Sequence, residues 1–350
     1  MEKRYKACLI GCGRMGATID DEVRGRPDSV LYLPYSHAAA YKSLENVELV
    51  AVADVVAEKV EAAKQRYGVP RGYTDYKEMI EAEKPDIVSI ATRPSTHASI
   101  TIFAAEHGVR GIYCEKPLCC SMAEADAMMK ACQSHGVKFN YGTQRRYMPL
   151  YKKIRELIEG GELGDIQCIV GLCGFGGVQW THTHTTDMLM FLAGDAEVEY
   201  VQGNVAVDDA DFDDNRIETD PRLLLGYVKF RNGVLGYIVP GLGYEFEVCG
   251  KRGKIRTLNN GLGCQLWKAG KWNILEETSF PKLKVESGTV NCIRDLIEAI
   301  ETGRETKGNI FLARRSQEIA FGFVESHSKG GARISMPLEN RSLRICPQDW

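Results

Sequence analysis

Short, almost continuously apolar runs alternate with amphipathic stretches through the first part of the chain. The apolar runs predict strands at 7–10, 47–53, 87–91, 111–114 and 138–141. The amphipathic stretches predict helices at 38–43, 57–67, 76–82, 96–106 and 122–134. A strand followed by a helix, repeated several times, is typical of a parallel, doubly wound sheet. Strands without polar alternation are expected in such a sheet because helices cover both of its faces.

The pattern changes after about residue 145. Longer strand-like segments now dominate, at 166–173, 198–207, 223–230, 234–239 and 246–249. Helices are predicted at 150–159, 186–192, 290–301 and 312–326. Asn232 and Gly233, between two strands, favour a type I′ hairpin turn because both residue types accept positive φ. We therefore predict an α/β protein with two domains, 1–143 with the doubly wound parallel sheet and 144–350 with a large, mostly antiparallel sheet.

Composition narrows the class of protein. The 350 residues are 44% apolar and 26% charged, and the net charge of −3 argues against a nucleic-acid-binding function. The longest strongly apolar run, 49–56, is too short for a membrane span, and the first residues run into a strand and leave no room for a signal peptide. Twelve cysteines without a CxxC spacing favour a reducing cytoplasm over a zinc or disulfide framework.

The first predicted strand runs directly into a glycine-rich turn, Gly11-Cys12-Gly13-Arg14-Met15-Gly16. Glycines at this spacing let the backbone turn tightly and approach a pyrophosphate at the start of a helix. The pattern alone is weak, and a plain turn is the alternative. Its position after the first strand of a strand–helix array makes dinucleotide binding by these six residues the better interpretation.

An acidic residue at the end of the second strand completes this prediction. Asp54 would accept hydrogen bonds from ribose hydroxyls and repel a 2′-phosphate, so we expect NAD rather than NADP as the cofactor. Gly16 and Asp54 are 38 residues apart, where about 20 are usual. The surplus lies in 20–36, which is either a surface insertion or a loop that folds over cofactor or substrate.

Several motifs together resemble the family of glucose–fructose oxidoreductase, inositol dehydrogenase and rhizopine-catabolism proteins (Gfo/Idh/MocA), over nearly the whole chain. Besides the glycine turn, they are Ala-Thr-Arg-Pro-Ser-Thr-His at 91–97, Glu-Lys-Pro at 115–117, Arg-Arg-Tyr at 145–147, His184-x-x-Asp187 and Met-Pro-Leu at 336–338. The resemblance implies an N-terminal Rossmann domain and a C-terminal α/β domain that binds substrate and whose open sheet often forms a homodimer or homotetramer. It also implies hydride transfer between NAD and a secondary alcohol of a sugar, cyclitol or related polyol.

The Glu-Lys-Pro motif is the most specific part of this resemblance. Lys116 follows a predicted strand at the edge of the sheet where ligands bind, and a partly desolvated lysine exchanges a proton near neutral pH. A surface ion pair with Glu115 is the alternative, but the motif favours Lys116 as a catalytic residue that also contacts cofactor and substrate. The resemblance further implies that Glu115, Thr92, Arg93 and His97 face the cofactor.

His184 is the second catalytic candidate. It precedes an apolar helix, and Asp187 lies three residues further on, within reach on the same helix face. The family commonly has an aspartate four residues before this histidine, where this chain has Trp180. His182 lies between them, and we expect it to supply the missing polar group. Trp180, His182, His184 and Asp187 are thus predicted to bind substrate, with His182 and His184 as catalytic residues.

Arg145 and Tyr147 follow the fifth predicted strand and resemble substrate-pocket positions, although pairing with carboxylates is the alternative. His182 and His184 flank a single residue, as metal ligands on a strand do, but no third ligand follows at a familiar spacing, so no metal is expected. The acidic run 208–214 is more typical of a solvated loop than of a cation site.

Two other functions stay open. Some members of the family cleave glycosides with tightly held NAD, by transient oxidation of the sugar. The change at Trp180 keeps such a hydrolase or lyase among the candidates. A non-catalytic regulator that senses cofactor or sugar would keep the same fold, but Lys116 and His184 argue against it.

Overall fold

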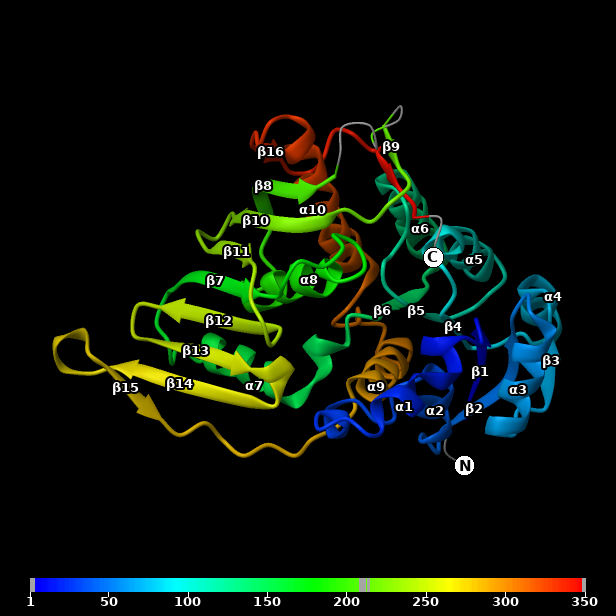
Figure 1. Ribbon diagram of the computed structural model, residues 1–350. Helices are drawn as coiled ribbons and strands as arrows, with labels where there is room; N and C mark the ends of the chain where they lie inside the picture. Colours follow the sequence, from blue (N-terminus) through cyan, green and yellow to red (C-terminus); the bar gives the residue numbers. More distant parts are fainter. Residues whose placement is uncertain (1–3, 208–211, 213–214, 348–350) are drawn as a thin grey trace. The chain divides into compact units, whose positions relative to one another are not determined.

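The computed structural model describes residues 4–207, 212 and 215–347 (Figure 1). Contacts within the chain divide it into two compact units. Unit 1 holds the described residues up to Met148 together with Val285–Arg314, and unit 2 holds Pro149–Lys284 together with the described residues 315–347. A single division at 143/144 is the expectation from sequence, whereas one later helix, within Val285–Arg314, belongs to unit 1.

Unit 1 is built on a six-stranded parallel sheet in the order β3-β2-β1-β4-β5-β6. The strands are β1 (Tyr5–Ile10), β2 (Val47–Ala53), β3 (Arg71–Tyr73), β4 (Ile87–Ile90), β5 (Gly111–Cys114) and β6 (Lys138–Tyr141). All the pairings are parallel, so the predicted doubly wound sheet is confirmed. The edge strand β3 was not predicted from the hydrophobic pattern, because its Arg-Gly-Tyr sequence is short and largely exposed.

Helices cover this sheet in two layers. One layer consists of α2 (His37–Lys42), α3 (Ala57–Tyr67) and α9 (Gly288–Thr302), and the other of α4 (Tyr76–Glu83), α5 (Pro94–Glu106) and α6 (Met122–His135). Local sequence sets several helix ends: Ser36 and Ser121 cap α2 and α6 by accepting backbone N–H groups, and Gly68 ends α3 in the left-handed conformation. Shorter helical segments are η1 (Arg14–Thr18), α1 (Ile19–Val23), η2 (Ser29–Leu31) and η3 (Gln144–Tyr147).

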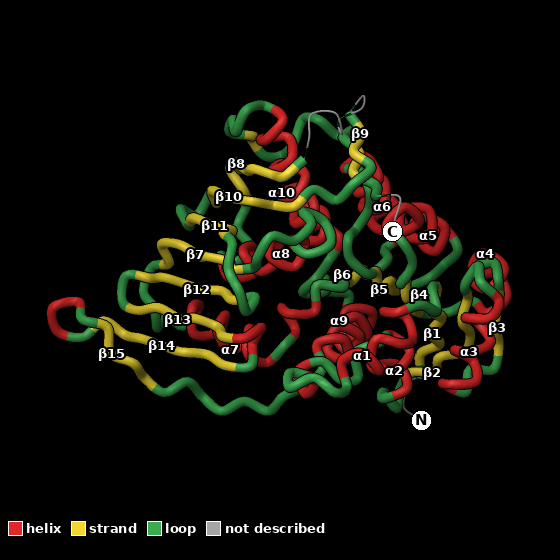
Figure 2. Tube along the Cα trace, in the orientation of Figure 1, coloured by secondary structure: helices red, strands yellow, loops and turns green. Residues whose placement is uncertain are grey.

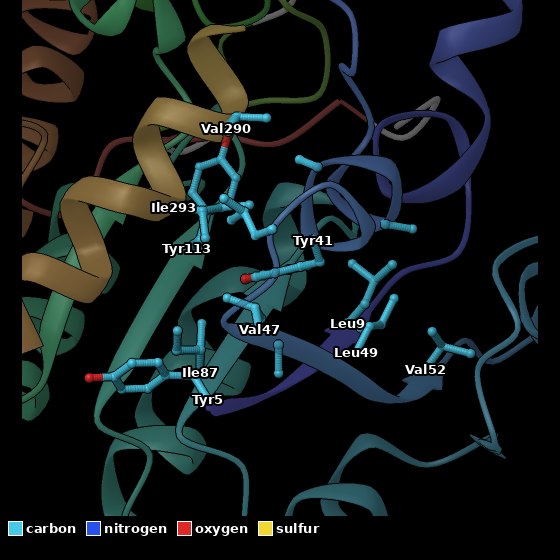
Figure 3. Close-up of a cluster of buried hydrophobic side chains, with 14 of the residues drawn as sticks. Tyr5, Leu9, Tyr41, Val47, Leu49, Val52, Ile87, Tyr113, Val290 and Ile293 are labelled. Atoms are coloured by element: carbon cyan, nitrogen blue, oxygen red, sulfur yellow. The ribbon is translucent and has the colours of Figure 1, made fainter. Parts of the chain in front are cut away.

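The layer of α2, α3 and α9 buries an apolar cluster that joins distant parts of the chain (Figure 3). Leu9 and Leu49 of the sheet belong to it, together with Tyr41 of α2 and Ile293 of α9. Helix α9 comes from the C-terminal half of the chain, and its apolar side chains complete this core. Burial of that apolar surface is the reason why α9 folds with unit 1.

Unit 2 is built on a nine-stranded sheet in the order β15-β14-β13-β12-β7-β11-β10-β8-β16 (Figure 2). The strands are β7 (Ile166–Leu172), β8 (Val198–Ala206), β10 (Arg222–Phe230), β11 (Leu235–Val239), β12 (Glu245–Gly250), β13 (Gly253–Leu258), β14 (Gly263–Ala269), β15 (Leu275–Thr278) and β16 (Ile334–Ser335). Only β7 and β11 pair in parallel, so the expected large, mostly antiparallel sheet is confirmed. The short strands β9 (Arg216–Ile217) and β17 (Arg344–Ile345) pair separately.

The helices of unit 2 are α7 (Pro149–Glu159), α8 (His182–Leu192) and α10 (Ile310–Ser328), the last of which begins in unit 1. Gly203 of β8 and Gly226 of β10 lie where any side chain would collide with Phe323, so α10 packs closely on the sheet. Gly171 of β7 likewise faces α8. Because side chains alternate along a strand, Val170 and its cross-strand neighbour Tyr237 lie on the other face, where both are half-buried.

The hairpin between β10 and β11 is confirmed, but its turn type differs from the prediction. Only Gly233 takes a positive φ, of 93°, while Asn232 does not. The amide of Gly233 donates to the carbonyl oxygen of Phe230, which is typical of a type I turn followed by a left-handed glycine. A type I′ turn would need positive φ at both central positions.

Two further observations concern the cysteines and the helices. All twelve cysteines carry free thiols. Within the part of the chain that the structure describes, no helix combines the length and the apolar character needed to cross a bilayer.

Candidate functional site

Ligands of open α/β sheets bind outside the carboxyl ends of the strands, where the strand order reverses. In unit 1 this point lies between β1 and β4, because β2 and β3 extend the sheet on one side and β5 and β6 on the other. The loops at the carboxyl ends carry Gly11 after β1, Asp54 after β2, Thr92 after β4 and Lys116 after β5. The fold therefore brings the residues predicted for cofactor binding to one edge of the sheet.

The three glycines of the turn meet different steric demands. Gly11 has a φ of 94°, and a Cβ there would lie 2.5 Å from the carbonyl oxygen of Ala91. A Cβ on Gly16 would lie 1.9 Å from the carbonyl oxygen of Gly11, so η1 can follow the turn only if this position has no side chain. A Cβ on Gly13 would meet nothing within 4 Å. The space beside the backbone of Gly13 is therefore open, as the close approach of a pyrophosphate requires.

Two backbone amides hold the Asp54 carboxylate. Its Oδ2 accepts a hydrogen bond from the amide of Cys12 at 2.8 Å, and its Oδ1 accepts one from the amide of Val56 at 3.0 Å. Each carboxylate oxygen has a further lone pair, so the half-buried side chain can also accept ribose hydroxyls. If the ribose binds at β2 and the pyrophosphate at β1, as predicted, the nicotinamide half of a dinucleotide would lie on the β4 and β5 side.

His97 joins the loops that follow β4 and β5. Its Nδ1 lies 2.9 Å from the carbonyl oxygen of Pro117, and its Nε2 lies 3.2 Å from that of Thr92. Burial lowers the pKa of this imidazole below its ordinary value, against the opposing effect of the two carbonyl groups. The side chain is fully buried, so His97 shapes the cofactor side of the sheet by holding these two loops together.

Glu115 lies in a buried hydrogen-bonded chain that the sequence motif alone does not reveal. Its Oε1 is 3.0 Å from Nε2 of His37, and its Oε2 accepts the backbone amide of Lys116 at 3.2 Å. Nδ1 of His37 is in turn 3.0 Å from Oγ of Ser89, which lies 2.9 Å from the hydroxyl of Tyr41. A histidine at the first position of a short helix has no local signal for this role, because its partner is 78 residues away.

Lys116 is half-buried directly after Glu115. Its backbone is held by the Glu115 carboxylate, and Pro117 follows it. The residue predicted to be catalytic thus stands in a restrained loop that follows β5 at the carboxyl edge of the sheet.

Segment 20–36 is tied to unit 1 at its end. The buried carboxylate of Asp20 accepts the amides of Tyr35 and Ser36, each at 2.9 Å. The carbonyl oxygen of Pro34 accepts the hydroxyl of Ser287, at the start of α9, at 2.6 Å. These contacts join the segment to the N-termini of α2 and α9, so it is an ordered part of unit 1.

The same segment carries two aromatic side chains toward the candidate site. The rings of Tyr32 and Tyr35 stack with their centroids 5.1 Å apart. Burial, reinforced by the nearby Glu115 carboxylate, raises the pKa of Tyr35 to about 12, and the charge of Arg145 opposes this effect. Tyr35 therefore lies near Glu115 and Arg145, which supports the interpretation of 20–36 as a loop over the cofactor or substrate rather than a remote surface insertion.

Both predicted residues of the Arg-Arg-Tyr motif, Arg145 and Tyr147, are buried. The Tyr147 hydroxyl lies 2.8 Å from both Asn140 Oδ1 and Asp295 Oδ2, and burial raises the pKa of Tyr147 well above its ordinary value. This pairing with a carboxylate, which the sequence leaves open, favours a structural role in holding η3. Arg145 lies in the same turn of η3, near Tyr32 and Tyr35.

In unit 2 the first turn of α8 includes both candidate histidines, because the helix begins at His182 rather than near 186. His182 is fully buried, and its Nδ1 lies 3.2 Å from Oγ1 of Thr185. Burial lowers its pKa from 6.5 to about 4, and the carbonyl of Gly174 offsets only part of this effect. The structure therefore holds His182 neutral inside unit 2, a placement that suits positioning better than proton transfer.

Tyr244 supports this turn, although no sequence signal singles it out. Its hydroxyl lies 2.9 Å from Oγ1 of Thr185 and donates to the carbonyl oxygen of Thr181 at 3.1 Å. Its φ of 51° is uncommon for a bulky residue, and such strain persists only where surrounding contacts enforce it. The adjacent Gly243 also has a positive φ, of 86°.

The other predicted residues of unit 2 differ in exposure. Trp180 is 45% exposed, and its amide donates to Oδ2 of Asp220 at 2.9 Å. His184 is half-buried, and Asp187 is 1% exposed one turn further along α8. Trp180 and His184 thus remain accessible to a ligand, while Asp187 belongs to the interior.

No group of three or more His, Cys, Asp or Glu side chains among residues 4–207, 212 and 215–347 is arranged to hold a metal ion. The acidic run 208–214, predicted to be a solvated loop, lies outside the described residues except for Phe212.

In a comparison with known protein families, both halves of the chain match models of the same family. The Gfo/Idh/MocA model described as an oxidoreductase family with an NAD-binding Rossmann fold matches residues 6–143. The model described as the C-terminal alpha/beta domain of the same oxidoreductase family matches residues 174–336. Together these matches cover most of the 350 residues.

Individual relatives are similar over parts of the chain. D-apiose dehydrogenase of Paraburkholderia graminis is 32% identical over 162 residues, which cover 46% of this chain and 38% of that protein. Myo-inositol 2-dehydrogenase of Thermotoga maritima is 28% identical over 240 residues, 63% of this chain and 70% of that protein. The solved structure of levoglucosan dehydrogenase with NADH and levoglucosan has a TM-score of 0.74 at 20% identity, covers 96% of this chain and 100% of that one, and shows the same fold.

Proposed function

The chain belongs to the Gfo/Idh/MocA oxidoreductase family, and we propose that it transfers a hydride between NAD and a secondary alcohol of a sugar, cyclitol or related polyol. Its N-terminal domain is the NAD-binding Rossmann domain of that family. The observation that carries the proposal is the half-buried Lys116, held by Glu115 on the nicotinamide side of the sheet. Relatives named D-apiose dehydrogenase and myo-inositol 2-dehydrogenase support this substrate class.

In this proposal Lys116 is the acid–base residue. Bound NAD⁺ supplies the hydride acceptor for the carbinol carbon. The neutral amine of Lys116 takes the proton of the substrate hydroxyl as the C–H bond breaks, and the resulting ammonium donates a hydrogen bond to the new carbonyl oxygen. In the reverse direction the ammonium returns that proton. The contact between Nδ1 of His97 and the carbonyl oxygen of Pro117 holds the loop that carries Lys116 in place.

We assign His184 and Trp180 to substrate binding in the same reaction. His184 is half-buried and offers an imidazole that can accept or donate at a sugar hydroxyl. Trp180 is 45% exposed and offers an aromatic face for the C–H side of a sugar ring. His182 and Asp187 are buried, so we assign them to holding the first turns of α8. His182, initially a catalytic candidate, becomes a positioning residue in this assignment.

A second candidate is a glycoside hydrolase or lyase that oxidises its substrate transiently and returns the hydride in each turnover. It is favoured by a single observation, the presence of Trp180 where the family commonly has an aspartate. Such an enzyme would release a cleaved product without net formation of NADH. The same protein and the same assay distinguish it from a dehydrogenase.

We also propose a cytoplasmic homodimer or homotetramer that assembles through the sheet of unit 2. Its open face carries half-buried apolar side chains such as Val170 and Tyr237, which a second copy could cover. The twelve free thiols support a reducing compartment. Light scattering of the purified protein tests the assembly.

The deciding experiment incubates the purified chain with NAD⁺ and a panel of cyclitols, aldoses, polyols and glycosides, and follows NADH absorbance together with product analysis. Accumulation of NADH in step with a ketone or lactone product supports the dehydrogenase. Cleaved glycoside without net NADH supports the second candidate. Cofactor binding without turnover of any member of the panel would overturn both and favour a sensor.

A further inference from the structure

The imidazole of His37 contacts the Glu-Lys-Pro motif at the carboxylate of Glu115. Its Nε2 lies 3.0 Å from Oε1 of Glu115, whose other oxygen accepts the amide of Lys116 at 3.2 Å. The ring stacks on Tyr113 with centroids 4.3 Å apart and planes at 9°. His37 is fully buried and Glu115 is 4% exposed, so this carboxylate depends on protein donors rather than on water.

The hydrogen-bond directions in this chain follow from its chemistry. An ionised carboxylate only accepts, so Nε2 of His37 must carry the proton that it donates to Glu115. On the other side of the ring, Nδ1 lies 3.0 Å from Oγ of Ser89, which lies 2.9 Å from the hydroxyl of Tyr41. The bond from Nε2 to Glu115 is the one that reaches the carboxylate beside Lys116.

The position of His37 is itself secured on its helix. It is the first residue of α2, and the preceding N-cap Ser36 accepts the amide of Ala39. The amide of Ser36 is bound by the buried carboxylate of Asp20 at 2.9 Å. Segment 20–36 thus ends at the restrained N-cap of α2. This restraint places His37, the first residue of the helix, beside Glu115.

Glu115 has little room to find another arrangement. A Cβ on Gly142, in the loop after β6, would lie 2.9 Å from its Oε1, so the backbone of that loop closes one side of the carboxylate. The plane of the carboxylate is therefore set by this contact, by His37 and by the amide of Lys116. Loss of the His37 bond would leave a desolvated oxygen whose only relief is rotation, which would break the bond to Lys116.

We propose that His37 is a positioning residue for the Glu-Lys-Pro motif: by donating from Nε2 to Glu115, it fixes the backbone of Lys116 and so preorganises the nicotinamide side of the cofactor site. This inference rests on the proposed function, in which the loop after β5 receives the nicotinamide half of NAD. It assigns His37 no contact with substrate or cofactor. Its effect passes through Glu115 alone.

The test compares two polar variants that differ in reach. H37Q places an amide donor near the position of Nε2, whereas H37N is one carbon shorter and reaches only toward Ser89. Calorimetric titration measures the affinity of each for NADH and for ADP-ribose, which lacks the nicotinamide. For H37N we expect NADH affinity to fall roughly tenfold, the scale of one hydrogen bond to a charged group, with ADP-ribose affinity unchanged. For H37Q we expect both affinities to stay near those of the original protein.

Two controls separate this role from a loss of stability. Y41F removes the far end of the same buried chain, so it should lower the melting temperature without changing the ratio of the two affinities. E115Q should shift that ratio by itself, and adding H37N to it should produce little further change, because both act at one carboxylate.

An unchanged affinity ratio in H37N would overturn the inference, as would an equal loss of NADH and ADP-ribose affinity. Full additivity of H37N and E115Q would also overturn it, since His37 would then act by another route. If H37N does not fold, E115Q decides: an unchanged ratio of NADH to ADP-ribose affinity in E115Q overturns the inference, because the proposed effect passes through this carboxylate alone, and a shifted ratio supports it. If the original protein binds neither NADH nor ADP-ribose, the proposed function fails at its cofactor step, a result that is distinct from any effect of the His37 variants.

Discussion

The Asp54 carboxylate and the backbone amide of Cys12 form a hydrogen bond of 2.8 Å between residues 42 positions apart. The bond joins the acid that follows β2 to the glycine turn that follows β1. The two elements proposed to receive the adenosine ribose and the pyrophosphate are therefore set relative to one another by the residue proposed to select the cofactor. Changes at Asp54 act on both.

This double role shapes the first prediction, which concerns cofactor choice. Asp54→Asn keeps an oxygen that can accept from Cys12 but removes the charge that repels a 2′-phosphate. We expect its preference for NAD over NADP to fall about tenfold or more, as measured by titration with both cofactors. Asp54→Ala should weaken NAD binding further because it also releases the turn. An unchanged preference in Asp54→Asn would show that this carboxylate is not at the ribose.

The second prediction separates two glycines of the turn. Gly13→Ala adds a methyl group where no atom lies within 4 Å and where φ is −80°, so its melting temperature should stay near that of the original protein. NADH affinity should nevertheless fall at least tenfold, because the methyl group occupies the approach of the pyrophosphate. Gly16→Ala should instead be strongly destabilised, since its Cβ would lie 1.9 Å from the carbonyl oxygen of Gly11. Thermal unfolding and NADH titration of both variants provide the check.

The third prediction concerns proton transfer. Lys116→Ala should lower kcat by about 10²-fold or more, the scale of a positioned acid–base group, while NADH affinity changes little. Lys130→Ala removes an exposed lysine of α6 and is the matched control. Near-normal turnover of the Lys116→Ala variant, with any substrate that the panel identifies, would exclude the proposed role.

The fourth prediction concerns stability in acid. Because the pKa of His182 is about 4 in the folded protein and about 6.5 when unfolded, the unfolded chain binds more protons between these values. Folding stability is therefore fully present above about pH 6.5 and falls as the pH drops toward 4. This histidine alone should lower the free energy of unfolding by about 2 kcal/mol between pH 7.5 and pH 5.

Denaturant unfolding at the two pH values tests this directly. His182→Gln should lose this part of the pH dependence, whereas His107→Gln, at an exposed position, should keep it. Identical pH dependence in the original protein and His182→Gln would mean that His182 is not held neutral by burial.

The fifth prediction separates the exposed and buried residues around α8. His184→Gln should lose most of kcat, because its half-buried imidazole is assigned to the substrate hydroxyl. Trp180→Ala should mainly raise KM, because it removes an exposed aromatic face, and Trp180→Phe should restore much of the affinity. A Trp180→Ala variant with normal KM and depressed kcat would place this residue in the chemical step instead.

Local sequence indicated most elements of the first sheet and their parallel, doubly wound arrangement. The bounds of β2, β5 and β6 agree with the predicted strands, since a mainly apolar run forms a buried strand whichever helices cover it. The glycine turn and Asp54 could also be proposed for cofactor binding, because that prediction depends on spacing next to a strand end. The short, polar β3 carries no such pattern and forms only because it pairs with β2.

Tertiary structure decided the contacts that join distant residues. The burial of His182, the partner of Tyr147 at Asp295 and the return of α9 to unit 1 all depend on which elements pack together. The bond between His37 and Glu115 spans 78 residues and is of the same kind. Local patterns report whether a residue suits a helix, a strand or a turn, whereas burial and hydrogen bonding depend on neighbours that only the folded chain provides. For this protein the sequence therefore identified the family and the cofactor and predicted a catalytic role for Lys116, and the fold decided which histidines are held in its interior.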